Sequence, residues 1–121
     1  MKPAISTVCS LHASLESILE DYAAGQCRSV ELWLGHAEQY LNGRPPEVLA
    51  ELFSKYKCEP IAATFQGGLL TSQGDARREH WSHFESRLAL CSAVSIPTLV
   101  LAGDVHGPLA PEGLGPLSVS L

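Results

Sequence analysis

The side chains that could do chemistry in this sequence stand within or directly after short apolar runs. Glu31 and Trp33 alternate with apolar residues in RSVELWL, and Gln66 ends the run PIAATFQ. Asp104 and His106 follow PTLVLA two residues apart, a spacing that suits a carboxylate–imidazole acid/base pair. The alternative for that pair is an ordinary loop that happens to contain an aspartate.

Other polar residues allow a functional and a structural interpretation side by side. His36 directly follows VELWLG and is either a ligand or a solvated loop histidine. His80 and His83 share a helical spacing that could hold a metal, but their helix should lie on the outside of the fold, so a solvated helix face is the favoured interpretation. Arg77 and Arg78 could meet a phosphate at a helix N-terminus, or could form a surface charge pair.

The cysteines give no sign of a metal or redox site. They are Cys9, Cys27, Cys58 and Cys91, and no two of them form a C-x-x-C pair. We therefore expect reduced and mostly buried thiols, and no metal ligands among the residues of this chain.

Composition excludes several classes of protein. Eight Lys+Arg against 13 Asp+Glu give a net charge of −5, which disfavours nucleic acid as a partner. No apolar stretch approaches the ~20 residues of a membrane helix, and the N-terminus carries no signal-peptide pattern. We expect a cytoplasmic protein with no membrane partner, in one domain of 121 residues.

Strand-like and helical patterns alternate along the chain. Short runs rich in apolar and β-branched residues predict strands, and apolar residues three and four apart predict helices. The predicted strands are residues 4–9, 28–34, 60–66 and 97–102; the predicted helices are 12–25, one opened by Pro45-Pro46, and one from Asp75 to about Ser95. The second helix is expected to bury a stripe of Val48, Leu49, Leu52, Phe53 and Tyr56. Asp75 is the expected N-cap of the third helix, whose stripe is Trp81, Phe84, Leu88 and Cys91, widened by Leu90 and Val94. Residues 35–46 are expected to be a loop with a short helical turn near 37–41. The last residues, from about 111, predict the start of another helix.

The order of these elements predicts parallel strands, in either an open doubly wound sheet or a (β/α)8 barrel. No glycine-rich phosphate loop follows the first strand, and Gly67-Gly68 is either a weak phosphate signal or a sharp turn. Alternation places Glu31 on a strand face opposite Val30 and Leu32, and Thr64 together with Gln66 on a face of the third strand. A barrel interior accommodates such polar faces, so the pattern favours a barrel.

Three segments carry a resemblance to a known family. VELWL, the turn QGGLL, and the passage RLALCSAVSIPTLVLA, in this order and spacing, resemble the sugar phosphate isomerase/epimerase family of xylose isomerase-like TIM barrels. The resemblance covers roughly residues 2–121. It implies a partial (β/α)8 TIM barrel of about four βα units, the N-terminal half of the family's domain, since the complete fold has eight.

The resemblance also implies a chemistry. Such enzymes hold a divalent metal at the ends of later strands, and a carboxylate moves a proton between adjacent carbons of a small sugar. Those ligand-bearing strands have no counterpart in this sequence, so we expect the chain to be inactive alone. Glu31, Trp33, His36, Gln66 and Asp104 are the expected substrate-binding residues, while no catalytic residue is assigned. Glu31 could equally be a structural carboxylate, and Trp33 could fill the core.

Two other functions remain open on the sequence. The chain could be a non-catalytic half-barrel that pairs with itself or with a partner half, because four parallel strands leave two free edges. An endonuclease-type relative that cleaves abasic DNA is the third, and the negative charge together with Gln66 at the end of the third strand counts against it.

Overall fold

The computed structural model describes residues 2–103 and Ser118 as an α/β fold. Its elements are β1 (Ile5–Ser6), the 3-10 helix η1 (Thr7–Ser10), α1 (Leu15–Ala24), β2 (Ser29–Trp33), α2 (Leu34–Leu41), α3 (Glu47–Tyr56), β3 (Glu59–Gln66), α4 (Gly74–Ala93) and β4 (Leu99–Leu101). Asp104, His106 and the helix expected from about residue 111 lie outside the described residues, apart from Ser118.

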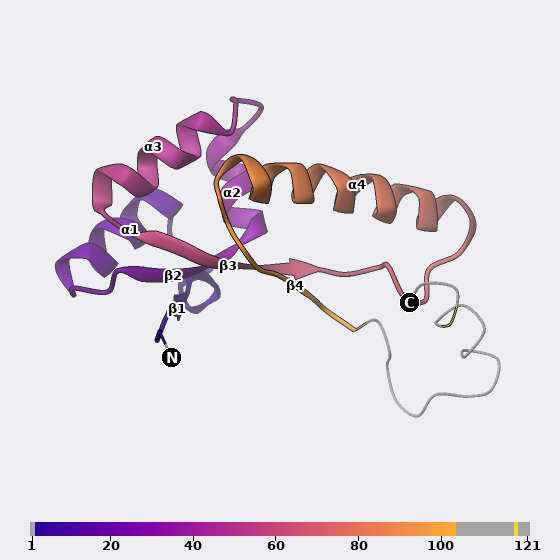
Figure 1. Cartoon of the computed structure of the whole chain (residues 1–121), viewed down its shortest axis with the longest axis horizontal. Coiled ribbons are helices and arrows are strands. Elements are labelled where there is room, and N and C mark those ends of the chain that lie inside the picture. The colour runs from indigo at the N-terminus through magenta and orange to yellow at the C-terminus, as the bar shows by residue number, and fades with distance from the viewer. Residues whose placement is uncertain (1, 104–117, 119–121) are drawn as a thin grey trace.

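The four strands form one parallel sheet in the order β1-β2-β3-β4. Each strand thus pairs with the next one along the chain, and Figure 1 shows the helices gathered over one face of the sheet. A doubly wound sheet reverses its strand order and carries helices on both faces. Sequential pairing with helices on one side is the arrangement of a TIM barrel, so the predicted partial barrel is confirmed.

The hydrophobic core lies between the sheet and the helices. On β2 and just after it, Val30, Leu32 and Leu34 are fully buried, whereas Glu31 and Trp33 between them are only partly buried. The predicted alternation of the second strand is therefore confirmed. Helix α3 contributes Leu49, Leu52 and Phe53 to the same core, following the predicted stripe.

The first strand is shorter than the sequence predicts, with two residues instead of six. The chain turns into η1 because the Ser6 hydroxyl caps the turn by accepting a hydrogen bond from the Val8 amide. The Thr7 hydroxyl is buried and accepts a hydrogen bond from the Trp33 amide at 2.8 Å. These side-chain bonds compete with strand pairing and place Cys9 in the turn rather than at a strand end.

The segment expected to be mainly a loop contains the complete helix α2. Leu34, Ala37 and Leu41 share one helical face and are buried, so packing stabilises what the local sequence suggests only as a turn. The helix ends at Asn42, which adopts the left-handed backbone conformation. His36 consequently belongs to a helix and not to a loop.

The stripe predicted for helix α4 is at least partly buried at every position except Leu88. Leu88, which the sequence placed in the buried stripe, is 43% exposed, while the Arg87 side chain is only 12% exposed. Asp75 was expected to cap the helix; instead the helix follows Gln73 without a side-chain cap, and Asp75 pairs with Arg78 in the first turn.

Candidate functional site

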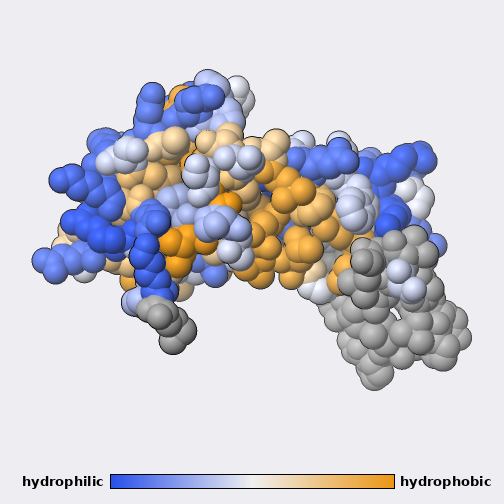
Figure 2. Space-filling model, in the orientation of Figure 1, coloured by the Kyte–Doolittle hydropathy of each residue, from blue (hydrophilic) through white to orange (hydrophobic). Residues whose placement is uncertain are grey.

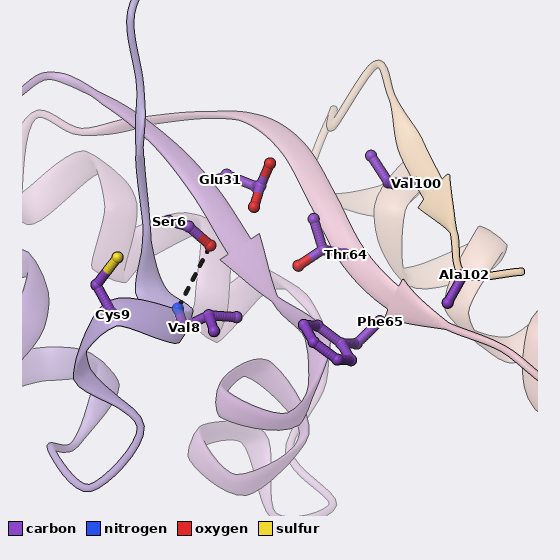
Figure 3. A pocket seen from close by; sticks show the side chains of 8 residues that line it. All are labelled: Ser6, Val8, Cys9, Glu31, Thr64, Phe65, Val100 and Ala102. Carbon is purple, nitrogen blue, oxygen red and sulfur yellow. Dashed lines mark hydrogen bonds between the residues drawn. The ribbon is translucent and has the colours of Figure 1, made fainter.

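A pocket of about 340 Å³ opens on the face of the sheet that the helices leave uncovered. Its walls come from all four strands: Ser6 from β1, Glu31 from β2, Thr64 and Phe65 from β3, and Val100 from β4 (Figure 3). The pocket lies on the concave side and reaches the C-terminal ends of β1, β3 and β4 through Ser6, Phe65 and Ala102. Barrel enzymes place their sites at this end of the strands. Its size and mainly apolar lining with a few polar groups are typical of small-molecule sites.

Two polar side chains of neighbouring strands meet in this pocket. Glu31 is partly buried, and Thr64 is only 7% exposed. The hydroxyl of Thr64 has no hydrogen-bond partner among the described residues, although a buried hydroxyl normally has one. A ligand hydroxyl would satisfy this group, and the Glu31 carboxylate beside it would accept a second hydrogen bond.

Phe65 forms an aromatic wall of the pocket because the backbone changes conformation at this residue. Phe65 has a φ of +73°, the left-handed region that favours glycine, and the residue is 56% exposed. The pairing of β3 with β4 is irregular here: Ala63 pairs with Leu99 and Gln66 with Leu101. Such a β-bulge re-aims side chains, so Thr64 and Phe65 both line the pocket.

The same bulge removes Gln66 from the face that it was expected to share with Glu31 and Thr64. Strict alternation would place Gln66 beside Thr64, and that expectation is wrong because the bulge falls between them. Gln66 is 1% exposed, donates a hydrogen bond to the Gly67 carbonyl and accepts one from Arg87 of α4. It lies outside the lining of the pocket; its role in substrate binding stays a prediction.

Trp33 and His36 form an aromatic cluster beside the pocket. The Trp33 ring meets His36 edge-on with centroids 4.8 Å apart, and meets Phe65 edge-on at 6.3 Å. His36, expected in a loop, is 2% exposed within α2, with Nε2 3.4 Å from the Leu11 carbonyl oxygen. The Trp33 ring therefore contacts the Phe65 ring that lines the pocket.

Asp104, the remaining candidate, lies outside the described residues, and its binding role stays a prediction.

A charged cluster that the sequence did not indicate lies where α4 crosses α2. Arg87 donates from Nε and Nη2 to the two carboxylate oxygens of Glu38, at 2.8 and 3.1 Å. His83 Nε2 lies 2.9 Å from the same carboxylate. Partial burial disfavours the charge of Glu38, but the hydrogen bonds from Arg87 and His83 outweigh it and lower the pKa of the carboxyl.

The spacing of α4 carried a signal for this cluster. Phe84, Arg87, Cys91 and Val94 recur at intervals of three and four residues, and all of them are at least partly buried. An arginine on a helix face that packs toward a sheet needs a partner, and Glu38 provides it. The predicted stripe shares Phe84, Cys91 and Val94 with this face and differs in having Leu88 where the structure buries Arg87.

The two helix histidines do not share a ligand. His83 pairs with Glu38, whereas the His80 ring packs against Gly68, which has a φ of +78° in the turn after β3. The turn interpretation of Gly67-Gly68 agrees with this geometry, and the solvated helix face expected for His80 is wrong.

The described residues do not fit a divalent metal. Glu31 is the single carboxylate lining the pocket, and no group of three His, Cys, Asp or Glu side chains within the described part of the chain could hold an ion. No step of a reaction is therefore assigned through a metal on these residues.

No helix within residues 2–103 is both long and apolar enough to cross a membrane.

Comparison with known proteins gives fold matches only. No protein-family model matches the chain, and no curated protein matches it. Among solved structures, the IOLI protein with a bound zinc atom is similar with a TM-score of 0.81 and 19% identity, over 98% of this chain and 44% of that one. A xylose isomerase-like TIM barrel/4-hydroxyphenylpyruvate dioxygenase fusion protein is similar with a TM-score of 0.76 and 18% identity. The match covers 100% of this chain and 19% of the fusion protein.

A D-psicose 3-epimerase determined in the presence of D-fructose is also similar, with a TM-score of 0.65 and 19% identity, over 93% of this chain and 43% of that one. The chain thus spans less than half the length of each of these three structures. Together with the sequential parallel sheet, these matches show that the chain has the fold of part of a TIM barrel.

Proposed function

We propose that this chain is part of an isomerase or epimerase that acts on a small sugar or related polyol. The observation that carries the proposal is the concave-face pocket, where the Glu31 carboxylate and the unpartnered Thr64 hydroxyl stand beside the Phe65 ring. A sugar offers hydroxyls for polar groups and a C–H face for an aromatic ring. The fold neighbours support the same class, because one of them is a D-psicose 3-epimerase.

Within this proposal the chain's own residues bind and orient the substrate. Glu31 accepts a hydrogen bond from one substrate hydroxyl, and Thr64 exchanges a hydrogen bond with a neighbouring one. Fixing two hydroxyls and one ring face sets which carbon of the substrate faces the rest of the site. The reaction itself moves a proton from one carbon to its neighbour through a carboxylate, and we assign that carboxylate to no residue of this chain.

The divalent metal implied by the resemblance belongs, in this proposal, to residues outside the described part. The zinc atom of one fold neighbour is compatible with metal use in such barrels. When bound, the metal would polarise a substrate carbonyl or hydroxyl. Because the described residues lack a ligand set, we expect residues 2–103 to bind substrate without turnover.

Binding of D-fructose to the 121-residue chain, followed by two-dimensional NMR, tests the proposal. We expect shifts of the Glu31, Thr64 and Phe65 amides, with a Kd on the order of 1 mM, since only a few contacts are available. Glu31→Gln and Thr64→Val should each weaken binding, whereas Glu51→Gln on the exposed face of α3 should not. Shifts that avoid these residues, or no binding of any hexose or polyol, would reject the proposal.

A second candidate function, association as a half-barrel, is favoured by the apolar surface of the open face. Figure 2 shows apolar residues gathered around the sheet, and Phe65, Val100 and Leu101 are each about half exposed. In the described part of the chain, β1 and β4 each pair on one side alone. Unpaired edges and exposed apolar side chains favour association with further strands of the same kind, supplied by a second copy or a partner half.

Sedimentation equilibrium at micromolar concentration tests this candidate. A dimer that Leu101→Lys on β4 dissociates, while Leu88→Lys on α4 leaves it intact, supports association through the strand edge. A stable monomer throughout this range would reject association with a second copy.

The expected cytoplasmic location stays a prediction.

A further inference from the structure

The left-handed backbone at Phe65 requires an explanation, because a bulky residue rarely adopts it. Glycine is the usual residue at such a bulge, since it has no Cβ to clash with the neighbouring carbonyl. Phe65 adopts a φ of +73°, and the residue is 56% exposed in the pocket wall. The ring therefore gains little burial in return for this conformation, and another interaction must hold the backbone.

Arg87 supplies that interaction from α4. Its Nη1 donates a hydrogen bond of 2.7 Å to the Phe65 carbonyl oxygen and lies 3.3 Å from Gln66 Oε1. A guanidinium gives a charge-assisted hydrogen bond to the carbonyl, and this is stronger than a neutral one. Gln66 is held in turn by its bond to the Gly67 carbonyl, and its own carbonyl accepts from the Ala102 amide at 2.7 Å. The residues on both sides of the bulge are thereby fixed.

Glu38 fixes the direction of the arginine. It binds Nε and Nη2 through both carboxylate oxygens, so only Nη1 of the planar guanidinium is left to face β3. The Arg87 side chain itself is 12% exposed, so most of its surface packs against the neighbouring residues. The cluster thus connects two helices on the covered face of the sheet to one residue on the open face.

We propose that the Glu38–Arg87 pair is a positioning element for ligand binding, which holds the Phe65 bulge and so keeps the aromatic ring in the pocket wall. This inference rests on the proposed function, that the pocket binds a small sugar or polyol. Phe65 selects ligands with an apolar C–H face, and Arg87 acts on the ligand through Phe65 without touching it.

The test combines NMR contacts with binding in a Trp81→Phe background, where Trp33 is the single remaining tryptophan. The parent should show contacts between the Phe65 ring and the Trp33 indole, which lie 6.3 Å apart by ring centroids. Arg87→Leu should abolish these contacts and weaken D-fructose binding roughly 2- to 10-fold, the value of one aromatic contact. Arg44→Leu is the matched control, because Arg44 binds carbonyls of Leu41 and Tyr40 away from the pocket.

A double-mutant cycle separates positioning from general stability. Phe65→Gly removes the ring and suits the left-handed backbone, so adding Arg87→Leu to it should weaken binding no further. An equal effect of Arg87→Leu with and without Phe65→Gly would overturn the proposal, as would an Arg87→Leu protein that keeps the ring contacts and the parent's affinity. If Arg87→Leu does not fold, Glu38→Gln and Arg87→Lys take its place. Each of them removes the bidentate Glu38–Arg87 pairing, and the ring contacts and D-fructose affinity test the positioning role in the same way.

The two proposals fail in different ways. A parent protein that binds no hexose or polyol removes the proposed function, and the ring contacts alone then decide whether Arg87 positions Phe65. A parent that binds D-fructose, with an Arg87→Leu variant that binds equally well, removes the positioning role and leaves the proposed function in place.

Discussion

The Trp33 ring lies directly over Gly35, so that a Cβ placed on Gly35 would come within 2.6 Å of the indole carbons. This contact sets the position of the indole at the end of β2. From there the ring meets both His36 and Phe65 edge-on. The absence of a side chain at residue 35 therefore determines where the aromatic cluster beside the pocket sits.

Gly35→Ala should consequently destabilise the protein by about 1–3 kcal/mol, the usual cost of forcing a methyl group into a packed site. The indole would have to move against His36 and Phe65, so its near-UV circular dichroism should change as well. Urea unfolding measures the stability. Gly103→Ala serves as the control, because a Cβ there meets nothing within 4 Å. Equal stability of the two variants would show that the indole has room to move.

The sequence was sufficient to predict the order of the elements and the two faces of β2. Val30 and Leu32 alternate with Glu31 in sequence and in burial, because a strand buried on one side repeats every two residues. The alternation of helices and strands predicted parallel pairing, and the polar faces of the second and third strands favoured the barrel, in which each strand pairs with the next. Glu31 and Thr64 were placed on polar faces by the same rule, and both line the pocket.

The end of β3 was not predictable by that rule. The bulge puts Phe65 in the pocket wall and Gln66 on the opposite side, and no glycine marks the position. The contact that stabilises the bulge comes from Arg87, 22 residues later in the chain. A local pattern contains no information about such a distant partner, so strict alternation failed between Thr64 and Gln66.

Leu32 on β2 and Leu88 on α4 offer a direct comparison of a buried and an exposed leucine. Leu32 is fully buried, so Leu32→Ala should lower the free energy of unfolding by about 2–5 kcal/mol. Leu88 lay in the buried stripe expected from sequence but is exposed in the structure, so Leu88→Ala should change stability by less than about 0.5 kcal/mol. Urea unfolding measures both variants, and a loss of several kcal/mol from Leu88→Ala would show that Leu88 is packed in the core as the sequence predicted.

The Glu38 carboxyl makes part of the stability depend on acid pH. Its pKa is lowered in the folded protein by Arg87 and His83, which outweigh the opposing effect of burial. The stabilisation is therefore present above the unfolded-state pKa of about 4.3 and is lost as the pH falls through the lower folded value. Because the carboxyl is partly exposed, we expect less than about 1 kcal/mol from it.

Glu38→Gln should remove this part of the acid dependence between about pH 5 and pH 3 and leave the rest. Urea midpoints measured across that range provide the test. Glu85→Gln, on the exposed face of α4, is the control and should retain the parent's slope. A Glu38→Gln protein with an unchanged slope would contradict a lowered pKa for the native carboxyl.

The four thiols should differ widely in reactivity, and the most reactive one reports on the pocket. Cys9 is exposed and lines the pocket, while Cys58 and Cys91 are buried. Burial raises the pKa of the Cys58 and Cys91 thiols, which lowers their content of reactive thiolate. With N-ethylmaleimide at neutral pH, Cys9 should react at least about tenfold faster than either of them.

Mass spectrometry of quenched samples identifies the modified residue. Cys9→Ser should remove the fast phase and Cys91→Ser should not. A ligand bound against Phe65 and Glu31 covers the same pocket, so D-fructose should slow the modification of Cys9 while leaving that of Cys27, outside this pocket, unchanged. Equal slowing at both cysteines would indicate a general solvent effect of the sugar, because a ligand in the pocket protects only the thiol that lines it.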